Sequence, residues 1–144
     1  MRLWHQALIP YLDRERLLGQ HRECCALRGK GWGKKHATVG YVFKHRPVML
    51  YRYHIKVIEE MRKRGYLPNL CWLECSYRGL SDAPSFTDRE NDARIFWGAL
   101  NNTGVVYPEH DDAYLKECIV LLKAKNAPID FERLEKELNI KGEK

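Results

Sequence analysis

The sequence predicts a mainly α, compact single-domain helical bundle of about three to four helices joined by long loops. The 144 residues suit one domain (1–144), and a content of 44% hydrophobic and 31% charged residues allows a buried core. Apolar residues recur every three or four positions in several segments, and no segment shows the strict alternation of a half-buried strand. These observations favour helices over a sheet.

The first helix is expected over residues 13–27. Asp13 is a suitable N-cap, and Gly29 ends the apolar pattern. The residues that recur at helical spacing are Leu17, Leu18, His21, Cys24, Cys25 and Leu27. Arg22 and Glu23 therefore project from the later turns of this helix.

The second helix is expected from Pro47 to Gly65, because proline suits a first helical turn and the cations at 62–64 suit a last one. Its predicted buried stripe is Leu50, Tyr53, Val57, Ile58 and Met61. Residues 66–107 are rich in aromatic residues and turn formers, which predicts long packed loops with a short helix around Asp92 to Leu100.

A third helix should follow Pro108 and a short final helix should begin at Asp130, its expected N-cap. The third helix would place Tyr114, Leu115, Cys118, Ile119 and Leu122 on one face, and the final helix carries Phe131, Leu134 and Leu138. Residues 127–144 are thus expected to form a C-terminal helical extension of the same domain.

Charge divides the chain into two halves. Residues 1–66 carry 15 Lys/Arg and 5 Asp/Glu, whereas residues 67–144 carry 10 and 14. The basic half is expected to face nucleic acid, because basic surfaces attract polyanions, and the second half is expected to serve packing. Positions 24–58 contain no acid, so Glu23 is a carboxylate at the edge of a positive field.

Cysteine content and hydropathy bear on where the protein works. Five cysteines without a regular framework, and no charged-then-apolar leader before them, favour a reducing cytoplasm over secretion. No apolar run approaches the roughly 20 residues that cross a bilayer, so no membrane association is expected.

Four segments of the first half form a pattern: Met1-Arg2-Leu3-Trp4, Tyr11-Leu12-Asp13-Arg14, Arg22-Glu23 and Arg62-Lys63-Arg64-Gly65-Tyr66. Together they resemble the pyrimidine-dimer DNA glycosylases of the phage-type endonuclease V kind. The resemblance covers residues 1–66, is faint from Tyr107 to Lys125 and lapses after Ala127.

The resemblance implies an all-helical DNA repair glycosylase with AP lyase activity on pyrimidine dimers or a related damaged base. The α-amine of Met1 would attack C1′, expel the base and form an imine that undergoes strand-cleaving elimination, with Glu23 as the essential carboxylate. An α-amine titrates near ~7.7–8.0 and is partly neutral at physiological pH, and imine chemistry needs no metal and no cofactor. The carboxylate can stabilise the positive charge that develops on the sugar and shuttle protons.

The expected partner is double-stranded damaged DNA, bound by a monomer. Under the resemblance Arg2 and Arg22 grip the sugar-phosphate backbone. The residues of the basic glycine-rich segment that should follow the phosphates are Arg28, Lys30, Lys34 and Lys35. Trp32 either stacks on a base of the kinked duplex or packs onto its own domain.

Several alternatives remain open or are disfavoured at this point. Arg2 is too large for the usual removal of Met1, which keeps open a non-catalytic nucleic-acid-binding module, and the Gly/Trp/Lys segment also suits RNA. A phosphate-binding loop is excluded, because Arg28 and Lys35 stand where that motif requires Gly and a hydroxyl residue. Metal binding and a Cys/His nucleophile built from Cys24 or Cys25 with His21 are both disfavoured, since no zinc-ligand spacing and no orienting group is recognisable.

Overall fold

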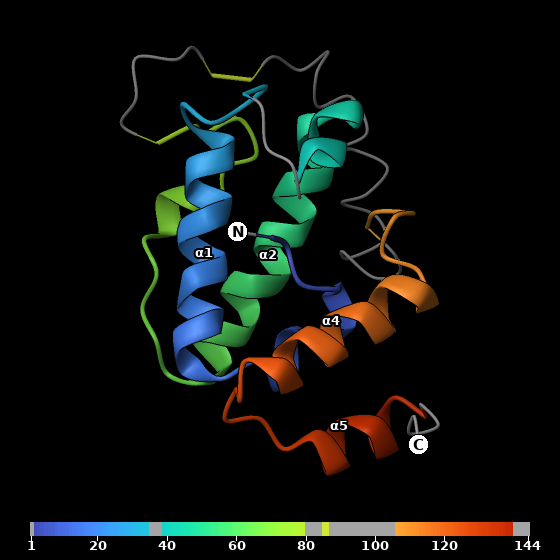
Figure 1. Cartoon of the computed structure of the whole chain (residues 1–144). Helices are drawn as coiled ribbons and strands as arrows, with labels where there is room; N and C mark the ends of the chain where they lie inside the picture. The colour runs from blue at the N-terminus through green and yellow to red at the C-terminus, as the bar shows by residue number, and fades with distance from the viewer. Residues whose placement is uncertain (1, 35–38, 80–84, 87–105, 140–144) are drawn as a thin grey trace.

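The computed structural model describes residues 2–34, 39–79, 85–86 and 106–139. Within these ranges the regular structure is helical and no strand occurs, which confirms the mainly α prediction (Figure 1). The elements in chain order are η1 (Gln6–Tyr11), α1 (Arg14–Arg28), η2 (Gly40–Lys44), α2 (Pro47–Lys63), η3 (Leu70–Leu73), α4 (Asp112–Ala124) and α5 (Phe131–Glu137), where η denotes a 3-10 helix. The short helix expected around Asp92 to Leu100 lies outside the described residues.

Helices α1 and α2 lie side by side and antiparallel, so that the end of α1 and the start of α2 share the upper end of the molecule (Figure 1). Both helices were predicted to within two residues. Pro47 occupies the first turn of α2, and Gly65, just beyond its end, has a φ of +89° that favours glycine. Asp13 flanks α1 as expected, but its carboxylate accepts from Arg16 at 3.2 Å instead of capping the backbone.

The core lies between these two helices and the chain start. Every residue of the predicted α2 stripe is buried. On α1 the buried apolar residues are Leu17, Cys24 and Leu27, whereas Leu18, His21 and Cys25 are half-buried and flank the stripe. No helix among the described residues combines the length and the apolar character that crossing a bilayer requires.

Helix α4 runs obliquely through the lower right of the view, to the right of α1, and α5 lies below it (Figure 1). Both begin at acidic caps. Asp111 Oδ1 accepts from the Tyr114 amide at 2.9 Å, and Asp130 Oδ1 accepts from the Arg133 amide at 3.0 Å, which confirms Asp130 as an N-cap. Four of the five residues expected on one face of α4 are buried, and Tyr114 is half-buried.

The first residues of the chain belong to the core. Leu3 is fully buried, Trp4 and His5 are nearly so, and the chain then enters η1, which packs on α2. The His5 Nδ1 atom caps η1 by accepting from the Ala7 amide at 3.1 Å. Burial of this segment fixes the direction from which the chain start approaches α1.

Candidate active site and nucleic-acid interface

A buried glutamine of α1 binds the backbone of the N-terminal segment. Gln20 Nε2 donates to the Arg2 carbonyl at 2.8 Å, and Gln20 Oε1 accepts from the Trp4 amide at 3.0 Å. The Tyr53 hydroxyl of α2 lies 2.6 Å from both Gln20 Oε1 and the Trp4 carbonyl, and shares its single proton between them. These partners fix the orientation of the Gln20 amide, because its oxygen faces donors and its nitrogen faces a carbonyl.

Glu23 follows Gln20 by three residues on α1. Residues at this spacing lie on one side of a helix with about 5–6 Å between their Cβ atoms. Gln20 and the predicted essential carboxylate therefore neighbour each other on α1, and the described chain start reaches α1 at Gln20. Glu23 is half-buried, and the described part of the chain contains no ion-pair partner for it. Met1, the predicted nucleophile, lies outside the described residues.

Helix α4 contacts the same segment from the other side. The Tyr114 hydroxyl donates to the Leu3 carbonyl at 2.5 Å, and Glu117 pairs with Arg2 at 3.0 Å. The Arg2 guanidinium also lies 5.8 Å from the centre of a Trp4 ring. Arg2 was predicted to grip the sugar-phosphate backbone, and the structure places it in an ion pair with an exposed carboxylate.

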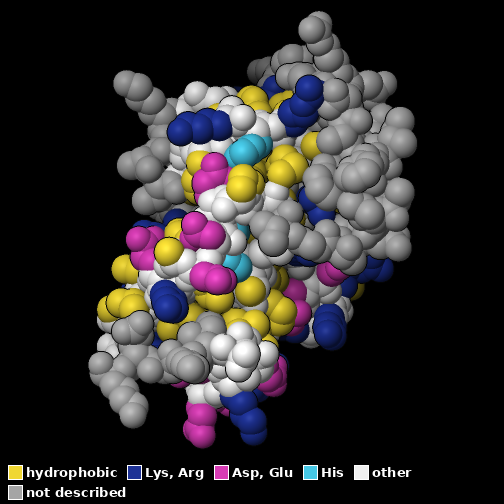
Figure 2. All heavy atoms as spheres, turned by 90° about the vertical axis from the view of Figure 1, so that its right-hand side faces the viewer, with side chains coloured by type: hydrophobic (Ala, Val, Ile, Leu, Met, Phe, Trp, Pro, Cys, Tyr) yellow, Lys and Arg dark blue, Asp and Glu magenta, His cyan; other side chains and the backbone are white. Residues whose placement is uncertain are grey.

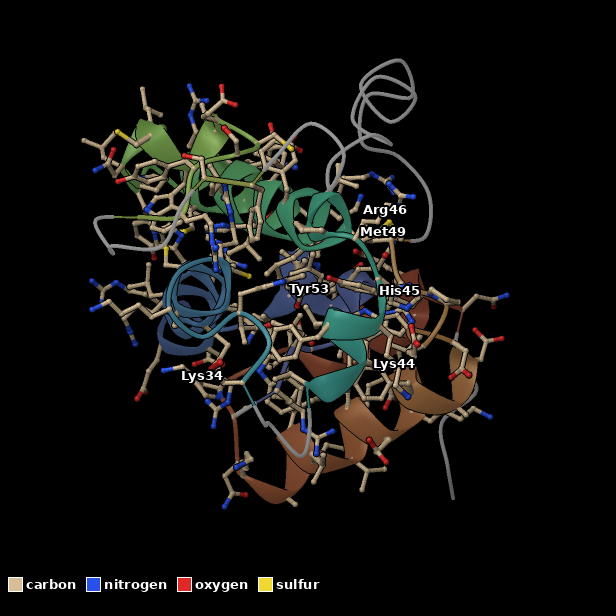
Figure 3. All side chains as sticks on the ribbon, turned by 90° about the horizontal axis from the view of Figure 1, so that it is seen from above. Lys34, Lys44, His45, Arg46, Met49 and Tyr53 are labelled. Atoms are coloured by element: carbon tan, nitrogen blue, oxygen red, sulfur yellow. The ribbon has the colours of Figure 1, made fainter. Side chains whose placement is uncertain are left out.

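The upper end of the molecule carries exposed cations from several elements. Of the predicted phosphate contacts, Arg22, Lys30 and Lys34 are exposed, and Lys35 lies outside the described residues. Lys44 and Arg46 are exposed at the end of η2 and before α2, and sequence reasoning missed both. Viewed from above, Lys34 lies on one side of Tyr53, and Lys44, His45, Arg46 and Met49 lie on the other (Figure 3).

Several exposed acidic residues lie on α4. Asp111 and Asp112 are exposed at its start, and Glu117 is exposed in its middle. Figure 2, which shows the right-hand side of the molecule in Figure 1, has acidic side chains gathered in the middle of the face and basic side chains at its upper end. A polyanion would therefore be attracted to the upper end and repelled from the start of α4.

The structure corrects the expectation that Arg28 contacts DNA. Its side chain is 1% exposed, so it is not available to a phosphate. Nη1 donates to the Trp72 carbonyl at 2.8 Å and to His54 Nδ1 at 2.9 Å, and Nη2 donates to the carbonyls of Glu74 and Tyr77. Arg28 thus binds the segment after α2 to the end of α1.

Trp32 packs onto its own domain, one of the two alternatives left open by the sequence. Its ring meets those of Phe43 and Phe86 edge-on, at 5.0 Å and 5.2 Å between ring centres. The described part of the glycine-rich segment forms consecutive turns over residues 29–33. Gly31 is required there, because a Cβ would lie 2.7 Å from the Ala26 carbonyl oxygen, and Gly33 has a φ of +80°.

Three potential metal ligands lie together between α1 and α2, namely His21, Cys25 and His54. Arg28 can only donate, so His54 Nδ1 accepts, and the neutral ring carries its proton on Nε2, which donates to His21 Nδ1 at 2.8 Å. Burial lowers the pKa of both histidines, which keeps the rings neutral. This network engages the lone pair that His54 would offer to a metal.

The same surroundings oppose a cysteine nucleophile. Burial raises the pKa of Cys25 to about 11 and that of Cys24 well above its usual value, so both are thiols at neutral pH. A Cys/His pair built from these residues would lack the thiolate that attacks.

Residues 1–74 match the family model of the pyrimidine dimer DNA glycosylases. The matched stretch is just over half of the 144 residues and contains η1, α1, η2, α2 and η3, with Gln20, Glu23 and Tyr53. Helices α4 and α5 lie beyond it. Neither the curated proteins nor the solved structures contain a match to the chain.

Proposed function

The chain belongs to the pyrimidine dimer DNA glycosylase family, and we propose that it is a DNA repair glycosylase with associated AP lyase activity. The observation that carries the finer proposal is the anchoring of the Arg2–Trp4 backbone on Gln20, one helical turn before Glu23. A nucleophile at the chain start and a carboxylate on α1 are the two groups that imine chemistry at C1′ requires.

The α-amino group of Met1 is the proposed nucleophile. Its lone pair forms the new N–C1′ bond as the glycosidic bond breaks, and the base leaves with the electron pair of the glycosidic bond. Loss of the amine protons and opening of the sugar ring then give an imine at C1′. Removal of a 2′ proton expels the 3′ phosphate and cleaves the strand.

Glu23 has two proposed roles in this sequence. Its negative charge stabilises the positive charge that develops on the sugar, and its carboxylate carries protons during ring opening and elimination. Cations at the upper end of the molecule hold the phosphodiester backbone, and the reacting nucleotide leaves the stack so that C1′ becomes accessible. No metal or cofactor enters these steps.

The test substitutes Glu23→Gln and measures strand cleavage and affinity on a duplex that contains one thymine dimer. Cleavage should fall at least 100-fold, because the charge that stabilises the transition state is lost, whereas the Kd should stay within about threefold. Glu15→Gln, which removes an exposed carboxylate from the first turn of the same helix, is the matched control and should cleave normally.

Equal cleavage by the Glu23→Gln variant and the wild-type protein would contradict the proposed role of Glu23. A wild-type protein that binds the duplex and leaves it intact would instead fit the non-catalytic binding module, the alternative that Arg2 keeps open.

A further inference from the structure

The N-terminal segment is held from two sides. The carbonyls of Arg2 and Trp4 meet Gln20 and Tyr53, whereas the carbonyl of Leu3, between them, meets Tyr114 of α4 at 2.5 Å. The Tyr114 contact therefore adds a constraint from α4 to a segment that Gln20, Tyr53 and the burial of Leu3 and Trp4 already hold on the other side.

Tyr114 is itself fixed in position. Tyr114 is half-buried, and its ring centre lies 5.1 Å from the ring centre of His110 and 6.3 Å from that of His5. Burial raises the pKa of Tyr114, so its hydroxyl remains a neutral donor. Glu117, one turn further on the same face of α4, holds the Arg2 side chain at 3.0 Å. Two contacts from one helix thus reach two consecutive residues next to Met1.

We propose that Tyr114 is a positioning residue that, through the Leu3 carbonyl, sets the direction in which the N-terminal amine approaches the damaged nucleotide. This inference rests on the proposed function. It extends the active site to α4, which lies outside the residues that match the family. The role proposed for Tyr114 is indirect, because it acts through the backbone of the segment that carries the nucleophile.

The test compares Tyr114→Phe with Tyr11→Phe. The first substitution removes only the hydroxyl and keeps the ring contacts. The second also removes a hydroxyl, one that donates to Glu137 at 2.7 Å and so joins η1 to α5. Each protein is mixed in excess with duplex DNA containing one abasic site, and the rate of borohydride-trapped adduct formation and the Kd are measured separately.

At saturating DNA, adduct formation by Tyr114→Phe should be about tenfold slower than by wild type, because a misplaced nucleophile reacts more slowly. Its Kd for the DNA should stay within twofold of wild type, because the phosphate contacts are intact. Tyr11→Phe should trap at the wild-type rate. If the Tyr114 hydroxyl served stability alone, Tyr114→Phe would lower the midpoint of urea unfolding without slowing adduct formation at saturating DNA.

Provided that the wild-type protein forms the adduct, two results would overturn the inference. One is an unchanged rate for Tyr114→Phe, and the other is an equal loss in Tyr11→Phe. If Tyr114→Phe shows no cooperative unfolding transition, Glu117→Gln replaces it, and an unchanged rate in that variant counts against the inference. Failure of the wild-type protein to form any adduct would contradict the proposed function itself.

Discussion

Replacement of Gln20 by Met should both destabilise the protein and release its N-terminal segment. The side chain is 2% exposed and contacts Arg2, Trp4 and Tyr53 at 2.8, 3.0 and 2.6 Å. Methionine fills a similar volume but leaves the Trp4 amide and the Arg2 carbonyl without their partner. A buried polar group that loses its partner costs about 1–3 kcal/mol, and Tyr53 can still donate to Trp4. For the two groups together, the expected loss of unfolding free energy is about 2–6 kcal/mol.

Urea denaturation measures this loss from the midpoint, provided that the slope of unfolding free energy with urea is unchanged. The loss is large against a total of about 7–20 kcal/mol, at roughly 0.05–0.15 kcal/mol per residue. Gln6→Met is the graded control, because Gln6 is only half-buried; its Oε1 accepts from the Val106 amide at 2.7 Å. A loss for Gln20→Met no greater than that for Gln6→Met would refute the anchoring role assigned to Gln20.

Two further predictions concern the interface and acid stability. Lys44→Ala and Arg46→Ala should each reduce the slope of log affinity for DNA against log salt concentration by about 0.9, because each removes one phosphate contact. Lys125→Ala, at the exposed end of α4, should leave this slope unchanged. Titrations of DNA binding at several salt concentrations measure the slope. His110 is 3% exposed and burial lowers its pKa to about 3, so the folded state keeps it neutral while the unfolded state binds a proton below about pH 6.5. Unfolding free energy should therefore fall by about 2 kcal/mol from this group between pH 7 and pH 5, and a His110→Gln variant that kept the same pH dependence would contradict the assignment.

Local signals in the sequence were sufficient for the helices. The apolar spacing of α1 and α2, Pro47 at a first turn and the cap at Asp130 all act within a few residues, so they can be read without the fold. The same holds for Glu23, which the helical pattern placed on a late turn of α1. The burial of residues 3–5 and the 3-10 helix η1 were not predicted, because both depend on packing against α2 and α4.

The site contacts that sequence reasoning missed join distant residues. The sequence predicted Arg28 on a basic surface, but Arg28 is buried. It donates to the carbonyls of Trp72, Glu74 and Tyr77, which lie more than 40 residues further along the chain. Gln20 did leave a signal, since it is a polar residue at i+3 from Leu17 and i−4 from Cys24 on an otherwise apolar stripe. Its partners at the chain start could only be identified once the fold was known.

The measurement that tests the central claim most directly is borohydride trapping on duplex DNA that carries either an abasic site or a thymine dimer. Reduction would convert the proposed imine into a stable bond, and mass spectrometry of the digested adduct would locate it. We predict an adduct on both substrates, with the DNA remnant on the peptide that begins at Met1. An adduct on a lysine instead, or none on either substrate with an unblocked α-amine, would contradict imine chemistry at the chain start.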